Sequence, residues 1–152
     1  MKKILCLILI ACISIVFVGC SEYSSTSSTS EFTVKASKDT VALGDVVTIQ
    51  VIFKSVEGVK SYAIRPVFDE ASFELVNARN LKSGEISDSS DGIVATLFAE
   101  PKTLSETVVA EYTLRAKSYG EQKAIGFSIS LKGDNDAIIE ASQPKNIYIN
   151  VK

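Results

Sequence analysis

The chain has 152 residues, a formal net charge of −2 and no histidine. Without imidazole, Ser-His-Asp and Cys-His catalysis and the usual zinc and copper sites are excluded. A mildly acidic chain without a basic patch is also a poor nucleic-acid binder, so we expect no nucleic-acid partner.

The amino terminus has the pattern of an export signal. Lys2 and Lys3 precede residues 4–18, an almost wholly apolar run of 15 residues. A membrane-spanning helix needs about 20 apolar residues, whereas a secretory signal needs about 7–15. The run ends at Phe17-Val18-Gly19-Cys20, which resembles the lipobox of bacterial lipoproteins. We therefore predict cleavage before Cys20 and its lipidation; an ordinary cleavable signal is the alternative.

Lipidation would anchor the chain outside the cytoplasm, on the plasma membrane or an outer membrane, because two acyl chains suffice for stable attachment. Cys6 and Cys12 lie in the segment predicted to be removed, so the mature chain would have no disulfide. Residues 21–30 hold eight Ser or Thr and predict a flexible tether. The expected organisation is a signal peptide (1–19), a lipidated tether (20–31) and one domain (32–152).

Apolar residues of the domain recur with a period of two. This alternation predicts strands with one buried face at three places: Val47, Ile49, Val51 and Phe53; Ile125, Phe127, Ile129 and Leu131; and Ile147, Ile149 and Val151. Further strands are predicted at residues 32–36, 60–68, 73–78, 92–99 and 108–117, with turns at Glu57-Gly58, Ser83-Gly84, Asp91-Gly92, Tyr119-Gly120 and Gly133-Asp134-Asn135. Short helical turns are expected at 69–72 or 102–106. The pattern predicts an all-β, antiparallel β-sandwich of about nine strands.

The order of these segments resembles that of cohesin domains. The resemblance begins at Gly44-Asp45, which opens a run of alternating valines and isoleucines. It continues through a strand that ends in the aromatic–Asp pair Phe68-Asp69, then a short apolar strand at 73–76 and a later strand at 109–117. The resemblance implies a jelly-roll-like sandwich shared with some carbohydrate-binding modules. It implies two non-catalytic activities: holding dockerin-bearing enzymes, or binding polysaccharide.

Two features depart from the cohesin pattern. Pro66 stands where a strand residue usually keeps its N–H, so we expect a bulge or a sheet edge there. In dockerin-binding cohesins, polar contacts come from the strand that aligns with Ser61 and Ala63, whose small side chains offer little hydrogen bonding.

Carboxylates offer two further possibilities. Glu100 and Glu106 could form a glycosidase pair, but solvated surface charge is the favoured interpretation. Asp134, Asn135 and Asp136, with Asp88 and Asp91 elsewhere, supply oxygen ligands for calcium, although Gly-Asp-Asn-Asp between strands is first a turn. We predict no cofactor.

Sugar-binding sandwiches often stack sugars on exposed aromatic rings. The chain has no tryptophan, which leaves five tyrosines: Tyr23, Tyr62, Tyr112, Tyr119 and Tyr148. Tyr62 and Tyr112 fit the buried alternation, whereas Tyr119 is expected at a turn and exposed. The ligand-binding candidates are Tyr119, Tyr62 and Arg65. The prediction is a membrane-anchored, non-catalytic lipoprotein that docks a protein partner, dockerin-like or otherwise; polysaccharide capture and a structural envelope role are the alternatives.

Overall fold

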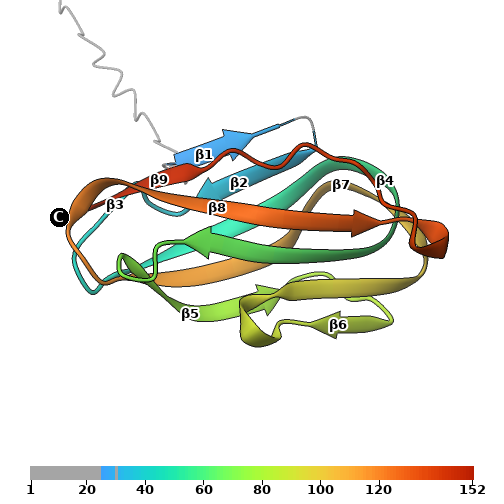
Figure 1. Cartoon of the computed structure of the whole chain (residues 1–152), viewed down its shortest axis with the longest axis horizontal. Helices are drawn as coiled ribbons and strands as arrows, with labels where there is room; N and C mark the ends of the chain where they lie inside the picture. The colour runs from blue at the N-terminus through green and yellow to red at the C-terminus, as the bar shows by residue number, and fades with distance from the viewer. Residues whose placement is uncertain (1–24, 30) are drawn as a thin grey trace, which may run out of the picture.

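The computed structural model describes residues 25–29 and 31–152, so the predicted signal peptide and Cys20 lie outside the described residues. The strands are β1 (Ser25–Ser28), β2 (Phe32–Ala36), β3 (Thr40–Val41), β4 (Val46–Phe68), β5 (Phe73–Asn80), β6 (Ile86–Asp88), β7 (Val94–Ala116), β8 (Gly120–Lys132) and β9 (Ile147–Val151), with 3-10 turns η1 (Ser90–Gly92) and η2 (Asp134–Asp136) (Figure 1). Across the described part of the chain, no helix has the length and apolar character needed to cross a membrane.

Alternation in the sequence decides which face of each strand is buried. In β4, Val47, Ile49, Val51 and Phe53 are all inaccessible to solvent. Burying a side chain of this size contributes about 1.5–3 kcal/mol relative to leaving it exposed. The predicted apolar faces of β8 and β9 are buried in the same way. The period-two pattern therefore gave the inward face of these three strands correctly.

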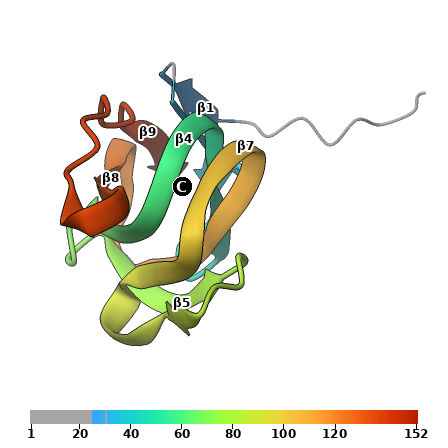
Figure 2. The same ribbon diagram turned by 90° about the vertical axis from the view of Figure 1, so that its right-hand side faces the viewer.

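All the strands belong to one hydrogen-bonded sheet, which folds over on itself. The first part of β4 pairs with β2, and its second part pairs with β8. The last part of β7 pairs with the first part of β4, and its first four residues pair with the second part of β4. Both long strands therefore bend from one layer to the other, as Figure 2 shows. The result confirms the all-β sandwich that the sequence predicts.

The core lies between the two layers and holds a row of aromatic rings. The ring centroids of Phe32 and Phe53 lie 5.1 Å apart, those of Phe53 and Tyr62 5.3 Å, and those of Tyr62 and Phe98 6.1 Å. The first two pairs are edge-on and the third is tilted, and aromatic pairs at these distances are favourable. Because the row joins residues of β2, β4 and β7, it fills the space inside the bend.

Two turn predictions near this bend were wrong. Glu57-Gly58 does not end a strand, because β4 continues through it with register shifts between Val56 and Ser61. Gly58 has a φ of 67°, which glycine adopts at little cost. The segment predicted as a possible helical turn at 102–106 is extended strand in β7 and pairs with β4. Bulges replace turns here because both strands stay paired as they change layers.

The predicted tether is partly folded. β1 lies within it and pairs antiparallel with β2, from Ser25 opposite Ala36 to Ser28 opposite Thr33. The Ser27 hydroxyl also donates to the Lys145 carbonyl at 2.7 Å. Composition predicted a coil because Ser and Thr bury little apolar area, but an edge strand needs only backbone partners.

The aromatic–Asp pair and Pro66 both have local roles at the end of β4. The Asp69 carboxylate accepts from the Ala71 N–H at 3.0 Å and the Ser72 hydroxyl at 2.6 Å, which closes the turn into β5. Pro66 pairs with β8 on one side, whereas pairing with β7 stops at Ile64. The expected sheet edge at Pro66 is therefore confirmed.

Candidate docking face

A shallow hollow lies on the outer face of the layer formed by β6, the start of β7, the end of β4, and β8. It has a volume of about 350 Å³. We call this surface the docking face; its side chains are Ser61, Ala63, Arg65, Ile86, Asp88, Ala95, Leu97, Ser130 and Lys132, of which all but Arg65 line the hollow, together with the buried Tyr62 and Thr96.

Small side chains make the floor of the hollow. In β4, Tyr62 and Ile64 are buried, so Ser61 and Ala63 point outward by alternation. Ala63 is paired with Ala95 on one side and Ser130 on the other. Paired residues of antiparallel strands share a face, so three small residues stand side by side across β7, β4 and β8. The backbone of the sheet is therefore closely approachable from outside.

Apolar side chains flank this floor. Ile86 in β6 pairs with Leu97 and is 61% exposed. On the opposite side, Ile138 forms a bridge with Lys132 and is 78% exposed. When a partner binds, exposed apolar side chains of this size become buried, and this burial favours binding.

A polar network fixes β6 at the rim. The Asn80 amide donates to the Ala95 carbonyl and the Thr96 hydroxyl, both at 2.8 Å. Its oxygen accepts from the Lys82 N–H at 3.0 Å. Gly84 lies so close to β7 that a Cβ there would stand 2.4 Å from the Leu97 carbonyl oxygen. These contacts hold the segment before β6 against β7, so Ile86 sits on an ordered rim.

The rim of the hollow carries charged side chains of both signs. The Ser90 hydroxyl, then the Ser90 and Ser89 N–H groups, hold the pKa of Asp88 below its usual range. Lys132 lies 3.2 Å from the Asp136 carboxylate, with both groups well exposed. Such exposed pairs contribute little to stability. The docking face therefore carries both signs of charge around an uncharged floor.

The three predicted ligand-binding residues lie in different places. Tyr62 is only 2% exposed, and its ring packs against Phe53 and Phe98, which confirms the core interpretation and leaves no ring face for a ligand. Burial raises the pKa of Tyr62, because the phenolate would be poorly solvated. Arg65 is exposed and lies two residues beyond Ala63 on the docking face. Tyr119 is 67% exposed in the turn before β8, as expected.

Tyr112 is also buried, as predicted. Its hydroxyl donates to the Ile64 carbonyl at 2.8 Å, at the point where β7 stops pairing with β4. Burial raises the pKa of Tyr112 strongly. The hydroxyl satisfies a carbonyl at the end of this ladder, where a buried acceptor without a partner would be costly.

The carboxylate hypotheses find little support in the geometry. Asp134, Asn135 and Asp136 form η2, with Asn135 and Asp136 at φ values of 52° and 60°. In the described ranges, no group of three or more His, Cys, Asp or Glu side chains is placed to hold a metal ion. Glu100 and Glu106 are exposed and six residues apart on β7, roughly 20 Å along an extended strand. Glycosidase pairs stand about 5–9.5 Å apart.

Most of the docking face escaped sequence analysis. β6 is three residues long and was not predicted, and Ile86 lies between polar residues that give no alternation. Ala95, Ser130 and Lys132 gain their importance only from their cross-strand neighbours. Ser61 and Ala63 were singled out, but only through the cohesin resemblance.

The fold has counterparts among solved structures. Neither a protein-family model nor a curated protein sequence matches the chain. A cohesin module from a Clostridium perfringens family 33 glycoside hydrolase is similar, with a TM-score of 0.62, 13% identity, and coverage of 84% of this chain and 99% of that one. The sixth cohesin of Acetivibrio cellulolyticus scaffoldin B, solved with a dockerin, has a TM-score of 0.56 at 13% identity, covering 80% and 99%.

A further cohesin from Acetivibrio cellulolyticus, a type II module solved in a cohesin–X-dockerin complex, has a TM-score of 0.54 at 15% identity, covering 84% of this chain and 99% of that one. Each of these modules is matched along almost its whole length, so the similarity extends over the domain rather than one motif. The chain has the cohesin fold, as the order of its sequence motifs predicted.

Proposed function

We propose that this chain is a non-catalytic docking module that binds a dockerin-type protein partner through the docking face. The observation that carries the proposal is the floor of Ser61, Ala63 and Ala95, flanked by the exposed Ile86. Two of the similar cohesins were solved in complexes with dockerins, and a sheet face with a small-residue floor suits the close approach of a partner helix.

The distribution of polar and charged groups over the docking face determines where hydrogen bonds and ion pairs to a partner would form. Ser61 and Ser130 offer single hydroxyls, and the charged groups Arg65, Asp88 and Lys132 stand at the margins. The centre of the interface would then be apolar and closely packed, with charged contacts at the rim. This is the usual anatomy of a specific protein interface.

The second part of the proposal is the anchor. Cleavage before Cys20 and its lipidation would hold the domain at the outer side of a bacterial membrane. β1 begins at Ser25, five residues after Cys20, a distance that an extended chain spans in at most about 18 Å. The docking face would then work close to the lipid surface, since β1 is itself hydrogen-bonded to the domain.

The docking proposal is tested with the full chain in detergent, immobilised and offered purified type I and type II dockerin modules and the secreted proteins of the source cell. We expect capture of a dockerin-bearing protein, and its loss in Ala63→Arg. No capture, or capture that Ala63→Arg leaves unchanged, would refute the proposed face.

The anchor is tested separately by cell fractionation. Cys20→Ala should move the chain from the membrane fraction to the soluble extracytoplasmic fraction without changing its melting temperature. Metabolic labelling with a fatty acid should mark the wild type only. Membrane retention of Cys20→Ala would contradict lipid anchoring and leave the docking proposal intact.

A further inference from the structure

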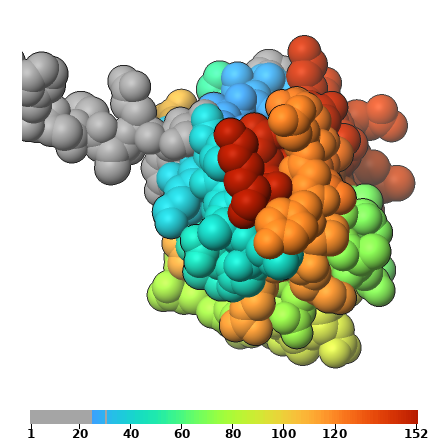
Figure 3. Space-filling view, turned by 90° about the vertical axis from the view of Figure 1, so that its left-hand side faces the viewer, coloured from blue at the N-terminus to red at the C-terminus, as the bar shows by residue number. Residues whose placement is uncertain are grey.

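A second hollow, with both polar and apolar lining residues, lies at the other end of β8 from the docking face. Its volume is about 410 Å³, and it is lined by Val67, Phe68, Asp69, Ser72, Gln122, Lys123, Ala124 and Asn146. Ala124 is six residues from Ser130, roughly 20 Å along the strand. Figure 3 views this end of the molecule, where the orange start of β8 lies between the red β9 and the green end of β4. The two hollows share no residue.

Hydrogen-bonding groups of every kind converge on this hollow. Gln122 and Asn146 are exposed, and their side-chain amides make no hydrogen bond to any described residue. Each amide offers both donors and an acceptor. The Ser72 hydroxyl and the Ala71 N–H, with lesser help from Lys123 and Lys117, hold the pKa of Asp69 below its usual range, so its carboxylate accepts at neutral pH.

The ammonium group of Lys123 is held in place beside that carboxylate. It lies 3.0 Å from the Ser72 hydroxyl oxygen and 3.4 Å from that of Ser118. Ser72 is itself only 2% exposed. The hollow therefore contains one negative and one positive group at fixed positions and has no net charge to attract an ion of either sign.

A tyrosine is the cross-strand neighbour of Ala124, one of the residues that line the hollow. Tyr148 pairs with Ala124 across β8 and β9, so the two side chains share the outer face, and Tyr148 is 46% exposed. Beside Ala124 on this face, Gly126 leaves room for Asn146, whose Oδ1 would lie 2.5 Å from a Cβ at that glycine. Small residues thus form a floor between the tyrosine and the amides.

We propose that this hollow is a binding site for a neutral saccharide, separate from the docking face. Vicinal hydroxyls of a sugar match side-chain amides, which both donate and accept, and a carboxylate, which accepts, and the apolar face of a sugar ring packs against the Tyr148 ring. The volume is within the usual range for small-ligand sites. Because the charges of Asp69 and Lys123 balance, the hollow gives an ionic ligand no net electrostatic attraction. The inference does not depend on the docking proposal.

The site is tested by saturation-transfer difference NMR on the full chain in detergent, with cellotetraose, xylotetraose, maltotetraose and N-acetylchitotetraose as probes. We expect saturation transfer to at least one probe, with weak affinity because the hollow is open. Asn146→Ala and Tyr148→Thr should each reduce that affinity at least fivefold. Threonine at position 148 keeps the strand propensity, and Gln122→Asn, which suits the φ of 52° at that position, provides a third variant.

Two control variants locate the site. Tyr119→Ser removes an exposed tyrosine that is not paired with a residue lining the hollow, and Ile86→Ala alters the docking face; both variants should bind the probe as the wild type does. The proposal is overturned if no probe receives saturation, if transfer is insensitive to all three hollow variants, or if it depends on Tyr119 instead of Tyr148.

Discussion

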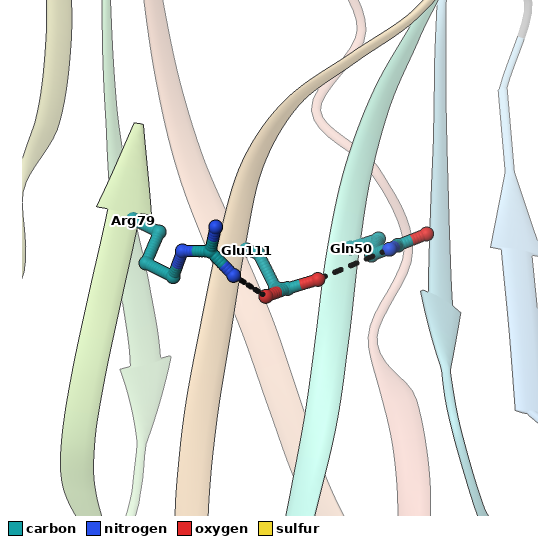
Figure 4. A network of polar contacts seen from close by, with 3 residues as sticks. All are labelled: Gln50, Arg79 and Glu111. Atoms are coloured by element: carbon teal, nitrogen blue, oxygen red, sulfur yellow. Dashed lines mark hydrogen bonds and ion pairs between the residues drawn. The ribbon is translucent and has the colours of Figure 1, made fainter. Parts of the chain in front are cut away.

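The two outer faces of the sandwich differ in whether their central side chains are bonded to one another across strands. On the face formed by β2, the start of β4, the end of β7 and β5, Glu111 bridges two neighbours (Figure 4). Its carboxylate accepts from the Gln50 amide at 3.1 Å and from the Arg79 guanidinium at 3.0 Å. We call this surface the ladder face. On the docking face, the corresponding central positions hold Ser61, Ala63 and Ala95. These small side chains have few groups that could form hydrogen bonds or ion pairs across strands.

This difference indicates which face stays exposed to solvent and which face binds a partner. Side chains that bond to each other across strands stabilise the sheet and cover its backbone, and a partner would have to break those bonds to pack there. Covering a floor of small side chains costs little free energy, because few side chains lose rotamer freedom or hydrogen bonds when a partner binds.

The largest effect is expected from placing a long charged side chain on the docking floor. Ala63→Arg should weaken binding of the dockerin-type partner by about 100-fold, because a guanidinium would be buried there without a counter-ion. Thr113→Arg, on the ladder face, is the matched control and should bind normally. Calorimetric titration measures both, and equal losses in the two variants would show that the faces do not differ.

A smaller loss is expected when an apolar rim contact is shortened. Ile86→Ala should weaken binding by about 10-fold, because the removed carbon atoms would cost about 1.4 kcal/mol of apolar contact with the partner. Since the Ile86 side chain is 61% exposed, the melting temperature of the Ile86→Ala variant should hardly differ from that of the wild type. Val76→Ala in β5, where the side chain is 45% exposed, should change neither quantity. Unchanged affinity in Ile86→Ala would remove β6 from the interface.

The ladder face is tested by stability instead of binding. Glu111→Ala should lower the free energy of unfolding by about 1 kcal/mol, because Gln50 and Arg79 lose a shared acceptor that is partly buried. Partner affinity should be unaffected. Urea denaturation at low and high salt is the measurement. A loss of affinity in this variant without a loss of stability would reverse the roles assigned to the two faces.

The smallest effect concerns pH. The depressed pKa of Asp69 means that its carboxylate stabilises the fold above the unfolded-state pKa of about 3.9. That contribution is lost as the pH falls through the lower, folded-state value. The urea midpoint of Asp69→Asn should therefore lie below that of the wild type at pH 7, and the gap should narrow at pH 3. A gap that stays constant would show that the carboxylate charge is not involved.

The amino-acid sequence predicted the structure best where a local pattern of residues decides it. Alternation located the buried faces of β4, β8 and β9, because a period of two places every second side chain on one face of any strand. The resemblance to cohesin domains implied a strand end at Phe68-Asp69, and the structure gives the local reason, because the Asp69 side chain closes the next turn. The placement of Tyr112 in the core and Tyr119 on the surface came from the same local reasoning.

The tertiary structure decided what depends on neighbours from distant parts of the chain. Composition could not predict β1, because its partners are the backbone groups of β2. Local turn signals could not predict that β4 passes through Gly58 unbroken, because the pairing with β7 carries it across the bend. Likewise, Ala63 forms part of the floor of the docking face only because Ala95 and Ser130 are paired with it on either side. The sequence by itself determined an all-β domain and the order of motifs that matches the cohesin fold; cross-strand register decided which of its small and polar residues share a surface.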